Sequence, residues 1–461
     1  MVQKNWTNIS NMFSPMDPIP PEKLEDWFVK RSNSPIDMLM YKLSPNHLPS
    51  KYILVGQPAS GKSSELTKLA EELEQTYDCL VVRIDLTDNL DADKANPVEI
   101  IFLMGVAIFK VASNKLIGKP PELCPDLSLL EELKNGLESI ATSYTENRDF
   151  KIDLGKLLDG LVVFGGAALA GPVGTIVGQA IAPTVRQATG GLFGRLQHRF
   201  TSGTSIQIVR KLDIEPKVED LIKSLSKIID DVYFKLNRPI VVLVDGLDKI
   251  RDPDVIKVNF IEKNFLNGPK CHVVYTGPLD LYYSPDFGAV RTRFSIVPFS
   301  NIKIHPPGNI DEVYESGYEF MRQVVESRLK SENLKTEDVI DLEALNMLIK
   351  GSGGVMRDFI RLVQNAVVYT QISKKDRIGI LEAVKALNEL RRQLKAQLTP
   401  DYQAIVDLVY KDQKRVDGTD GQGEKCDLLL RNDIILGYVN EDIWFDKHSV
   451  LTDQPWKALS S

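Results

Sequence analysis

The residues whose types and spacing most clearly indicate a chemistry lie in a short loop that begins at Gly56. Four residues separate Gly56 from Gly61, and Lys62 and Ser63 follow directly. Glycines let a backbone curl so that its N–H groups surround an anion, while lysine neutralises phosphate oxygens and a serine hydroxyl ligates magnesium. The sequence therefore predicts a site for ATP and Mg²⁺. The residues expected to contact the nucleotide are Gly56, Gln57, Pro58, Ala59, Ser60, Gly61, Lys62, Ser63 and Ser64.

A second part of this site is expected much later in the chain. The apolar run that starts after Pro239 ends in Asp245. Such a run reads as a buried parallel strand that delivers a carboxylate to the carboxyl edge of a sheet. We expect Asp245 and Ser63 to be the magnesium ligands of the protein. No other metal is expected, because the five histidines and four cysteines are dispersed.

The elements that must position these residues alternate between strand and helix. An apolar strand over 52–55 precedes the loop, and a helix with apolar residues on one face follows it. A second strand over 79–85 is followed by a helix that opens at Pro97. The predicted fold class is therefore α/β, with a parallel sheet of the phosphate-loop type at its core.

Four further segments carry a family resemblance. They are Asp245-Gly-Leu-Asp248, the strand end at Thr276, the arginines Arg291 and Arg293 before a last strand, and Gly353-Gly-Val-Met-Arg357. Together with the loop they resemble the prokaryotic STAND and AAA+ ATPases, including NACHT-type and origin-recognition-like members. Many prokaryotic relatives of this kind belong to anti-phage systems, and the resemblance covers residues from about 33 to 363.

The resemblance implies a role for each of these residues. Asp248 corresponds to the acid that positions the attacking water, although it could instead cap the following loop. Thr276 corresponds to sensor 1, and Arg357 to a sensor-2 arginine that contacts the γ-phosphate. Arg291 or Arg293 corresponds to an arginine finger that reaches a neighbouring subunit, or both are solvated surface arginines.

The chain divides into four expected regions. Residues 1–48 are rich in proline and form an N-terminal strap with one helix over 22–31. Residues 49–308 form the ATPase core, residues 309–395 a helical lid and residues 396–461 a winged-helix-like domain. Such a domain follows the lid in many of these ATPases.

A helical insertion is expected within the core, over 114–217. Its segment 161–185 is uncharged and rich in small residues, and it is long enough to span a bilayer. A permanent span would place the two halves of the nucleotide site on opposite sides of a membrane. Two alternatives remain, a hairpin that inserts conditionally and a hairpin buried in the protein or an oligomer.

Composition sets the remaining limits. A net charge of −7 gives no general attraction to nucleic acid or anionic lipid. The N-terminus lacks the pattern of a secretory signal, and the scattered cysteines fit a reducing compartment. We expect a cytoplasmic protein, with conditional membrane association through 161–185.

Three functions remain open at this stage. The first is an ATP-hydrolysing switch that forms a homo-oligomer or changes its protein effector or sensor partner, as the regulatory ATPase of an anti-phage system. The second is a DNA-associated AAA+ ATPase of the origin-recognition or transposition-regulator type. The acidic C-terminal region disfavours DNA binding. The third is a scaffold that binds nucleotide without turnover.

Overall fold

The computed structural model describes residues 5–86, 95–116, 119–142, 152–153, 205–206, 215–417, 421–439 and 442–457. The segment 161–185 lies outside these residues. The expectation of membrane contact through that segment therefore stays a prediction.

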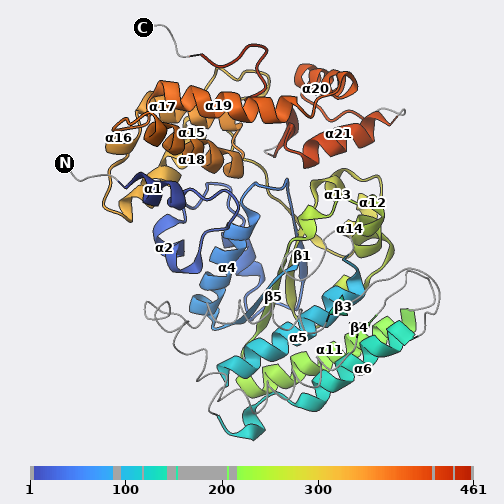
Figure 1. Ribbon diagram of the computed structural model, residues 1–461. Helices are drawn as coiled ribbons and strands as arrows, with labels where there is room; N and C mark the ends of the chain where they lie inside the picture. Colours follow the sequence, from blue (N-terminus) through green and yellow to red (C-terminus); the bar gives the residue numbers. More distant parts are fainter. Residues whose placement is uncertain are drawn as a thin grey trace.

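A five-stranded parallel sheet forms the centre of the ATPase core (Figure 1). Its strand order is β2-β5-β6-β1-β7. The bounds are β1 Lys51–Val55, β2 Leu80–Asp85, β5 Ile240–Asp245, β6 His272–Gly277 and β7 Ser295–Pro298. Each neighbouring pair is parallel. The carboxyl ends of β1, β5 and β6 therefore meet at one edge, and the predicted α/β fold class is confirmed.

The strand residues alternate between two apolar layers. One face packs with α3 (Ile36–Lys42) and α4 (Lys62–Tyr77). The opposite face belongs to the larger core with α5 (Pro97–Lys115), α6 (Leu127–Thr142) and α11 (Glu215–Leu236). Helices on both faces bury the sheet, which explains why its strands are continuous apolar runs.

Helix α5 is apolar on nearly every side. Among the described residues it alone is long and apolar enough to cross a membrane, and 83% of its most apolar window is buried inside the protein. It contacts β2, α6 and α11, which is the environment of a core helix. Its start is fixed by a capping box in which Asn96 and Glu99 each bond the other's backbone N–H.

Five helices form the lid above the carboxyl edge of the sheet (Figure 1). They are α15 (Glu315–Lys330), α16 (Thr336–Val339), α17 (Leu342–Ser352), α18 (Met356–Ile372) and α19 (Ile380–Lys395). The N-terminal helices α1 (Trp6–Met12) and α2 (Leu24–Trp27) contact α18 and α15.

The strap differs from its expected form in one respect. The helix expected over 22–31 is a 3₁₀ turn, η1 (Pro21–Lys23), followed by α2, which ends at Trp27. Phe28 is extended, with φ −74° and ψ 122°. The extended backbone carries Arg31 to the phosphate loop, where it is buried and hydrogen-bonded, so tertiary contacts override the local helix preference here.

The C-terminal unit consists of two helices and a hairpin. It contains α20 (Pro400–Asp412), α21 (Gln422–Arg431) and the antiparallel strands β8 (Ile435–Val439) and β9 (Ile443–Lys447). This order is that of a winged helix, as predicted.

The remaining elements are short. They are α12 (Pro253–Ile256), α13 (Leu279–Tyr283), α14 (Phe287–Arg291), the 3₁₀ helices η4 (Pro121–Leu123), η6 (Leu247–Lys249) and η8 (Phe265–Asn267), the π-helix η7 (Lys257–Glu262), and the paired strands β3 (Ile152–Asp153) and β4 (Ser205–Ile206).

Candidate functional site

The phosphate loop joins β1 to the first turn of α4. Ala59 and Gly61 adopt positive φ angles of 68° and 103°, as a loop needs when its N–H groups turn inward. Gly56 has a separate reason to be glycine, because a Cβ there would lie 2.1 Å from the carbonyl oxygen of Phe299. The residues of the loop and first helical turn that line a cavity of about 420 Å³ are Pro58, Ala59, Gly61, Lys62, Ser63, Ser64 and Glu65.

Lys62 is buried and bound within its own loop. Its Nζ donates to the carbonyl oxygens of Gly56 (2.9 Å) and Gln57 (2.6 Å) and lies 2.8 Å from Oδ2 of Asp248. The other carboxylate oxygen of Asp248, Oδ1, is buried without a hydrogen-bond partner. A phosphate that binds Lys62 would therefore compete with these oxygens for its three donors.

The expected magnesium ligands lie together. The Ser63 side chain is hydrogen-bonded to Asp245, and Oδ1 of Asp245 accepts the N–H of Gly246 at 2.8 Å. Burial, and then the nearby charge of Asp248, raise the pKa of Asp245. A hydroxyl and a buried carboxylate fit Mg²⁺, which takes such oxygens together with phosphate oxygens and water. A bound divalent cation would favour the charged form of Asp245.

A further carboxylate lies at the same edge. Asp85 ends β2, is the register partner of Asp245 and lines the cavity. The sequence offered a signal for Asp85, because an apolar strand ends in Asp there as it does at Asp245. Among the described residues, however, no group of three or more His, Cys, Asp or Glu side chains has the geometry of a metal site.

The strap contributes a buried arginine that the sequence analysis missed. Arg31 donates to the carbonyl oxygens of Ser60 (2.9 Å) and Ser300 (3.2 Å), and its Nε lies 3.2 Å from Glu65 on α4. Its guanidinium also lies over the ring of Phe299, 4.2 Å from the ring centre. Burial lowers the pKa of Arg31 to about 10, against the opposing effect of Glu65. Through Arg31, the strap therefore stabilises the backbone of the phosphate loop.

Lid helix α18 meets the loop at its N-terminus. The N–H of Arg357 donates to the carbonyl oxygen of Ala59 at 3.2 Å, and Arg357 lines the cavity. Arg357 and Asp248 also line a second cavity of about 400 Å³, which reaches the turn after α21. The structure therefore brings Arg357, Lys62 and Asp248 to one site.

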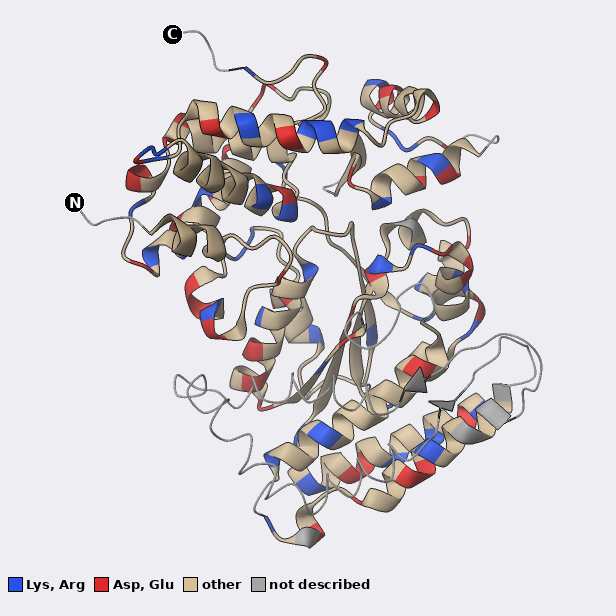
Figure 2. Cartoon of the chain, in the orientation of Figure 1, with Lys and Arg blue, Asp and Glu red and all other residues tan. Residues whose placement is uncertain are grey.

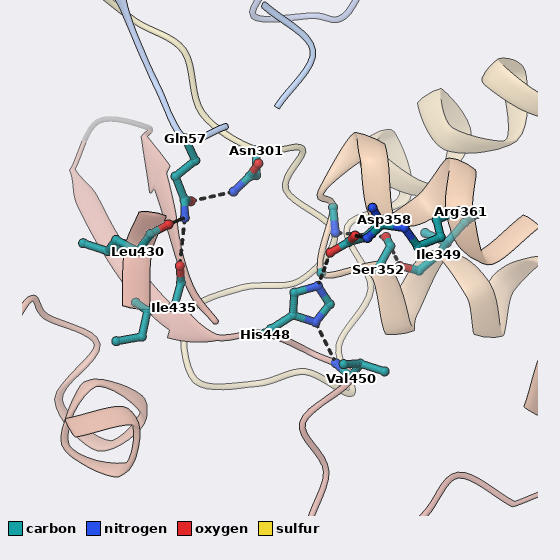
Figure 3. A network of polar contacts seen from close by, with 12 residues as sticks. Gln57, Asn301, Ile349, Ser352, Asp358, Arg361, Leu430, Ile435, His448 and Val450 are labelled. Carbon is teal, nitrogen blue, oxygen red and sulfur yellow. Dashed lines mark hydrogen bonds and ion pairs between the residues drawn. The ribbon is translucent and has the colours of Figure 1, made fainter. Parts of the chain in front are cut away.

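Gln57 connects the loop directly to the C-terminal unit (Figure 3). Its Nε2 donates to the carbonyl oxygens of Leu430 and Ile435, each at 2.8 Å. Its Oε1 accepts from Nδ2 of Asn301 and from the N–H of Gly437, each at 2.7 Å. The amide is 2% exposed and uses all four of its hydrogen-bonding positions. Gln57 does not line the cavity, so its side chain acts as a connector.

A second connection joins the C-terminal unit to the lid. Nδ1 of His448 accepts the N–H of Val450 at 3.1 Å, so the ring proton is on Nε2, which lies 3.3 Å from Oδ2 of Asp358 on α18 (Figure 3). Oδ1 of Asp358 accepts from Arg361 at 2.7 Å. Arg357 and Asp358 are adjacent, so the same helix turn contacts the loop, the cavity and the C-terminal unit.

Like Gln57, the expected site residues Gly56, Ser60 and Asp245 lie outside the lining of both cavities, and so do Thr276, Arg291 and Arg293. Thr276 is buried near the end of β6, and its Oγ1 has no hydrogen-bond partner. Arg293 donates through Nη1 to the carbonyl oxygens of Ile261 and Lys263. Arg291 is exposed at the end of α14. Of the two arginines, Arg291 is the exposed one, whereas Arg293 is bonded within its own chain.

No family model and no curated protein matches the chain. Among solved structures, it is similar to the ORC2 protein of Aeropyrum pernix in ADPNP–ADP complexes, with 10% identity, a TM-score of 0.42 and coverage of 96% of this chain and 94% of that chain. It is also similar to the ORC1 protein of Aeropyrum pernix in complex with DNA, with 12% identity, a TM-score of 0.40 and coverage of 94% and 95%. A third similar structure is a Walker-type ATPase of Pyrococcus abyssi, with 13% identity, a TM-score of 0.41 and coverage of 95% of this chain and 98% of that chain. Likeness at this level assigns neither a family nor a function.

Proposed function

We propose that this protein is an AAA+-type ATPase that binds and hydrolyses ATP and uses the bound nucleotide to control its C-terminal unit. The observation that carries the proposal is the position of Gln57. Gln57 belongs to the loop that would hold the phosphates, and its side chain makes four hydrogen bonds. Three of them are to backbone groups of the C-terminal unit, those of Leu430, Ile435 and Gly437. A change in the loop backbone therefore changes contacts of that unit.

The site residues divide the chemistry among them. Lys62 neutralises the outer phosphates, and Ser63 and Asp245 hold the magnesium ion, which supplies charge stabilisation at the phosphates. Arg357 adds a second positive charge from the lid. When Lys62 turns to the phosphates, both oxygens of Asp248 become available to accept a hydrogen bond from the attacking water.

The free energy of nucleotide binding can also drive a change in how the C-terminal unit is docked. Lys62 must leave the carbonyl oxygens of Gly56 and Gln57. The backbone of Gln57 thus responds to the phosphate while its side chain holds β8. Binding of nucleotide and docking of the C-terminal unit are therefore linked, and each must alter the other's free energy by the same amount.

Two biological settings are candidates for this ATPase. The sequence resemblance predicts a regulatory ATPase with an effector partner in anti-phage defence, and that prediction stays untested. DNA association is the second candidate, favoured by the winged-helix order of the C-terminal unit. Figure 2 shows acidic and basic residues interspersed along α6, α11 and α19. The C-terminal unit itself carries several acidic residues, among them Asp401, Asp407 and Asp427, which disfavours strong binding to a phosphate backbone.

The proposal is tested by measuring Mg-ATP binding and hydrolysis for the wild type and Lys62→Ala. Lys68→Ala is the matched control, because Lys68 lies on α4 and pairs with Glu71 at its surface. We expect Lys62→Ala to abolish both activities and Lys68→Ala to keep them. Hydrolysis by wild type and Lys62→Ala at equal rates would contradict the proposal. Binding without any turnover in the wild type would instead indicate a scaffold.

The same assay separates the two settings. Duplex DNA is added at several salt concentrations. Stimulation of hydrolysis that falls steeply with salt would support DNA association, because phosphate contacts release counterions. Absence of stimulation at low salt would exclude DNA as the activating partner.

A further inference from the structure

The nucleotide cavity contains a buried arginine that the proposed chemistry does not use. Arg328 lies on α15 and lines the cavity with Val324 and Trp27. Its side chain is 7% exposed. It is remote in sequence from every motif that indicated the site, so nothing in the sequence pattern drew attention to it.

Arg328 has few partners for a buried cation. Its Nη1 donates to the carbonyl oxygen of Val324 at 2.9 Å, and its Nε is buried without a hydrogen-bond partner. Within the part of the chain that the structure describes, no carboxylate lies within ion-pair distance of it. Two aromatic rings, Trp27 at 5.4 Å and Phe13 at 6.0 Å, face the guanidinium.

This environment is unfavourable for the charged form. Burial lowers the pKa of Arg328 to about 10, with no carboxylate to oppose the effect. A buried charge without a counterion or a full set of hydrogen bonds destabilises a protein unless something else satisfies it. The aromatic rings offset only part of that cost. Because Nε is fully buried, a ligand in the cavity would supply an acceptor to the terminal nitrogens of the guanidinium.

The helix geometry places Arg328 away from the phosphates. Phe320, on the same face of α15, lies 5.8 Å from Arg31, whose guanidinium bonds Ser60 of the phosphate loop. The backbone of Arg328 lies eight residues further along, which is about 12 Å at the rise of an α-helix. Its guanidinium reaches back by one turn to the carbonyl oxygen of Val324, which still leaves it beyond Phe320 on the side away from the phosphate loop. The cavity lining mixes polar side chains with apolar and aromatic ones, and the latter can pack against a nucleotide base. Its apolar lining residues include Ile19, Trp27, Phe28, Val29, Val324 and Ile360.

We propose that Arg328 is a specificity-determining residue that donates a hydrogen bond to an acceptor nitrogen on the adenine ring. A guanidinium has only donors, so its partner must be an acceptor. The ring nitrogens N1, N3 and N7 of adenine are acceptors, and the amino group is not. The inference rests on the proposed binding of ATP and adds which group reads the base.

The test compares ATP with its 1-deaza, 3-deaza and 7-deaza analogues, each of which lacks one acceptor nitrogen. Binding is measured for the wild type, Arg328→Met, which keeps the length and apolar stem, and Arg328→Lys, which keeps a charge. Arg322→Met is the matched control, since Arg322 lies on the same helix, pairs with Glu315 and Asn346 and does not line the cavity.

The wild type and the Arg322→Met control should bind one of the three analogues about 10-fold or more weakly than ATP, as expected for a hydrogen bond from a charged donor. Arg328→Met should bind ATP more weakly than the wild type and should lose the discrimination. If Arg328→Met does not fold, Arg328→Lys is used in its place. Its affinity for ATP, divided by its affinity for the same analogue, must then be smaller than in the wild type.

The proposal is overturned if wild-type protein binds ATP and all three analogues equally, or if the Arg328 variants retain the wild-type ratio. The second result would mean that Arg328 serves only to pack against Trp27 and Phe13. Failure of the wild type to bind ATP at all would refute the proposed function itself, so the two failures can be told apart.

Discussion

At the scale of single residues, the competition for Lys62 determines how the site works. Its Nζ is held by two loop carbonyls and by Asp248, although Lys62 also lines the cavity where phosphates would bind. In the proposed mechanism, Asp248 therefore has two roles in succession. It neutralises Lys62 before nucleotide binds, and it can accept a hydrogen bond from water once Lys62 has turned to phosphate.

These two roles predict opposite effects of one substitution. Asp248→Asn keeps the shape of the side chain but removes its charge. We expect ATP to bind several-fold more tightly, because Lys62 no longer has to leave a carboxylate. We expect hydrolysis to fall by about 10²-fold or more, because an amide is a poor base. Isothermal titration and a steady-state assay measure the two effects. Unchanged hydrolysis would show that Asp248 only caps its loop.

At the scale of elements, the sequence predicted the parts of the site that local motifs encode. The loop after β1, the carboxylate that ends β5 and the glycines before α18 follow from patterns within a few residues, and the structure brings them to one edge of the sheet. The α/β class follows from the same alternation of strands and helices.

The missed residues depend on contacts distant in the sequence. Arg31 reaches Ser60 and Ser300 from a proline-rich strap, and the 3₁₀ turn and extended backbone there have no strong local signal. Gln57 was expected to contact nucleotide as a member of the loop. Its side chain instead bonds carbonyl groups 373 and 378 residues away, and no local pattern could have indicated them.

Helix α5 gives an element-scale prediction about pH. Burial raises the pKa of Glu99 from its usual 4.5 to about 8. Between these values the unfolded chain loses a proton that the folded protein retains. The stability that the neutral side chain contributes is therefore full below about pH 4.5 and is lost as pH rises through about 8.

Glu99→Gln keeps the capping box without the ionisation. We expect its free energy of unfolding to exceed that of the wild type by at least about 1 kcal/mol at pH 8. The two proteins should be equally stable near pH 4.5. Urea unfolding at both pH values measures the difference. A constant difference at all pH values would mean that Glu99 remains ionised in the folded protein.

At the scale of the whole molecule, the nucleotide site draws on every region. The strap supplies Arg31, the core supplies the loop and Asp245, the lid supplies Arg357, and the C-terminal unit holds Gln57. Ligand binding at such a site can change the contacts of the strap, the lid and the C-terminal unit together.

Arg291 is the residue that we expect to act between subunits. Arg291→Ala should leave ATP affinity within about 2-fold of wild type, whereas hydrolysis in the assembled state should fall by about 10³-fold if the arginine stabilises the transition state. Particle mass and turnover are measured together over a range of protein concentrations. Turnover per subunit that is independent of concentration and of Arg291 would rule out this role. Arg293→Ala should instead lower stability, because Arg293 binds carbonyls of its own chain.

The central claim is that Gln57 links nucleotide binding to the C-terminal unit. Its most direct test is amide hydrogen exchange of β8 with and without Mg-ATP, in the wild type, in Gln57→Ala and in Asn301→Ala. The Asn301 control removes only one acceptor contact of Gln57 and leaves its bonds to Leu430, Ile435 and Gly437. We predict that Mg-ATP changes exchange in β8 of the wild type and of Asn301→Ala, and that Gln57→Ala, which still binds nucleotide, loses this response. An equal response in Gln57→Ala and wild type, or no response in the wild type, would contradict the claim.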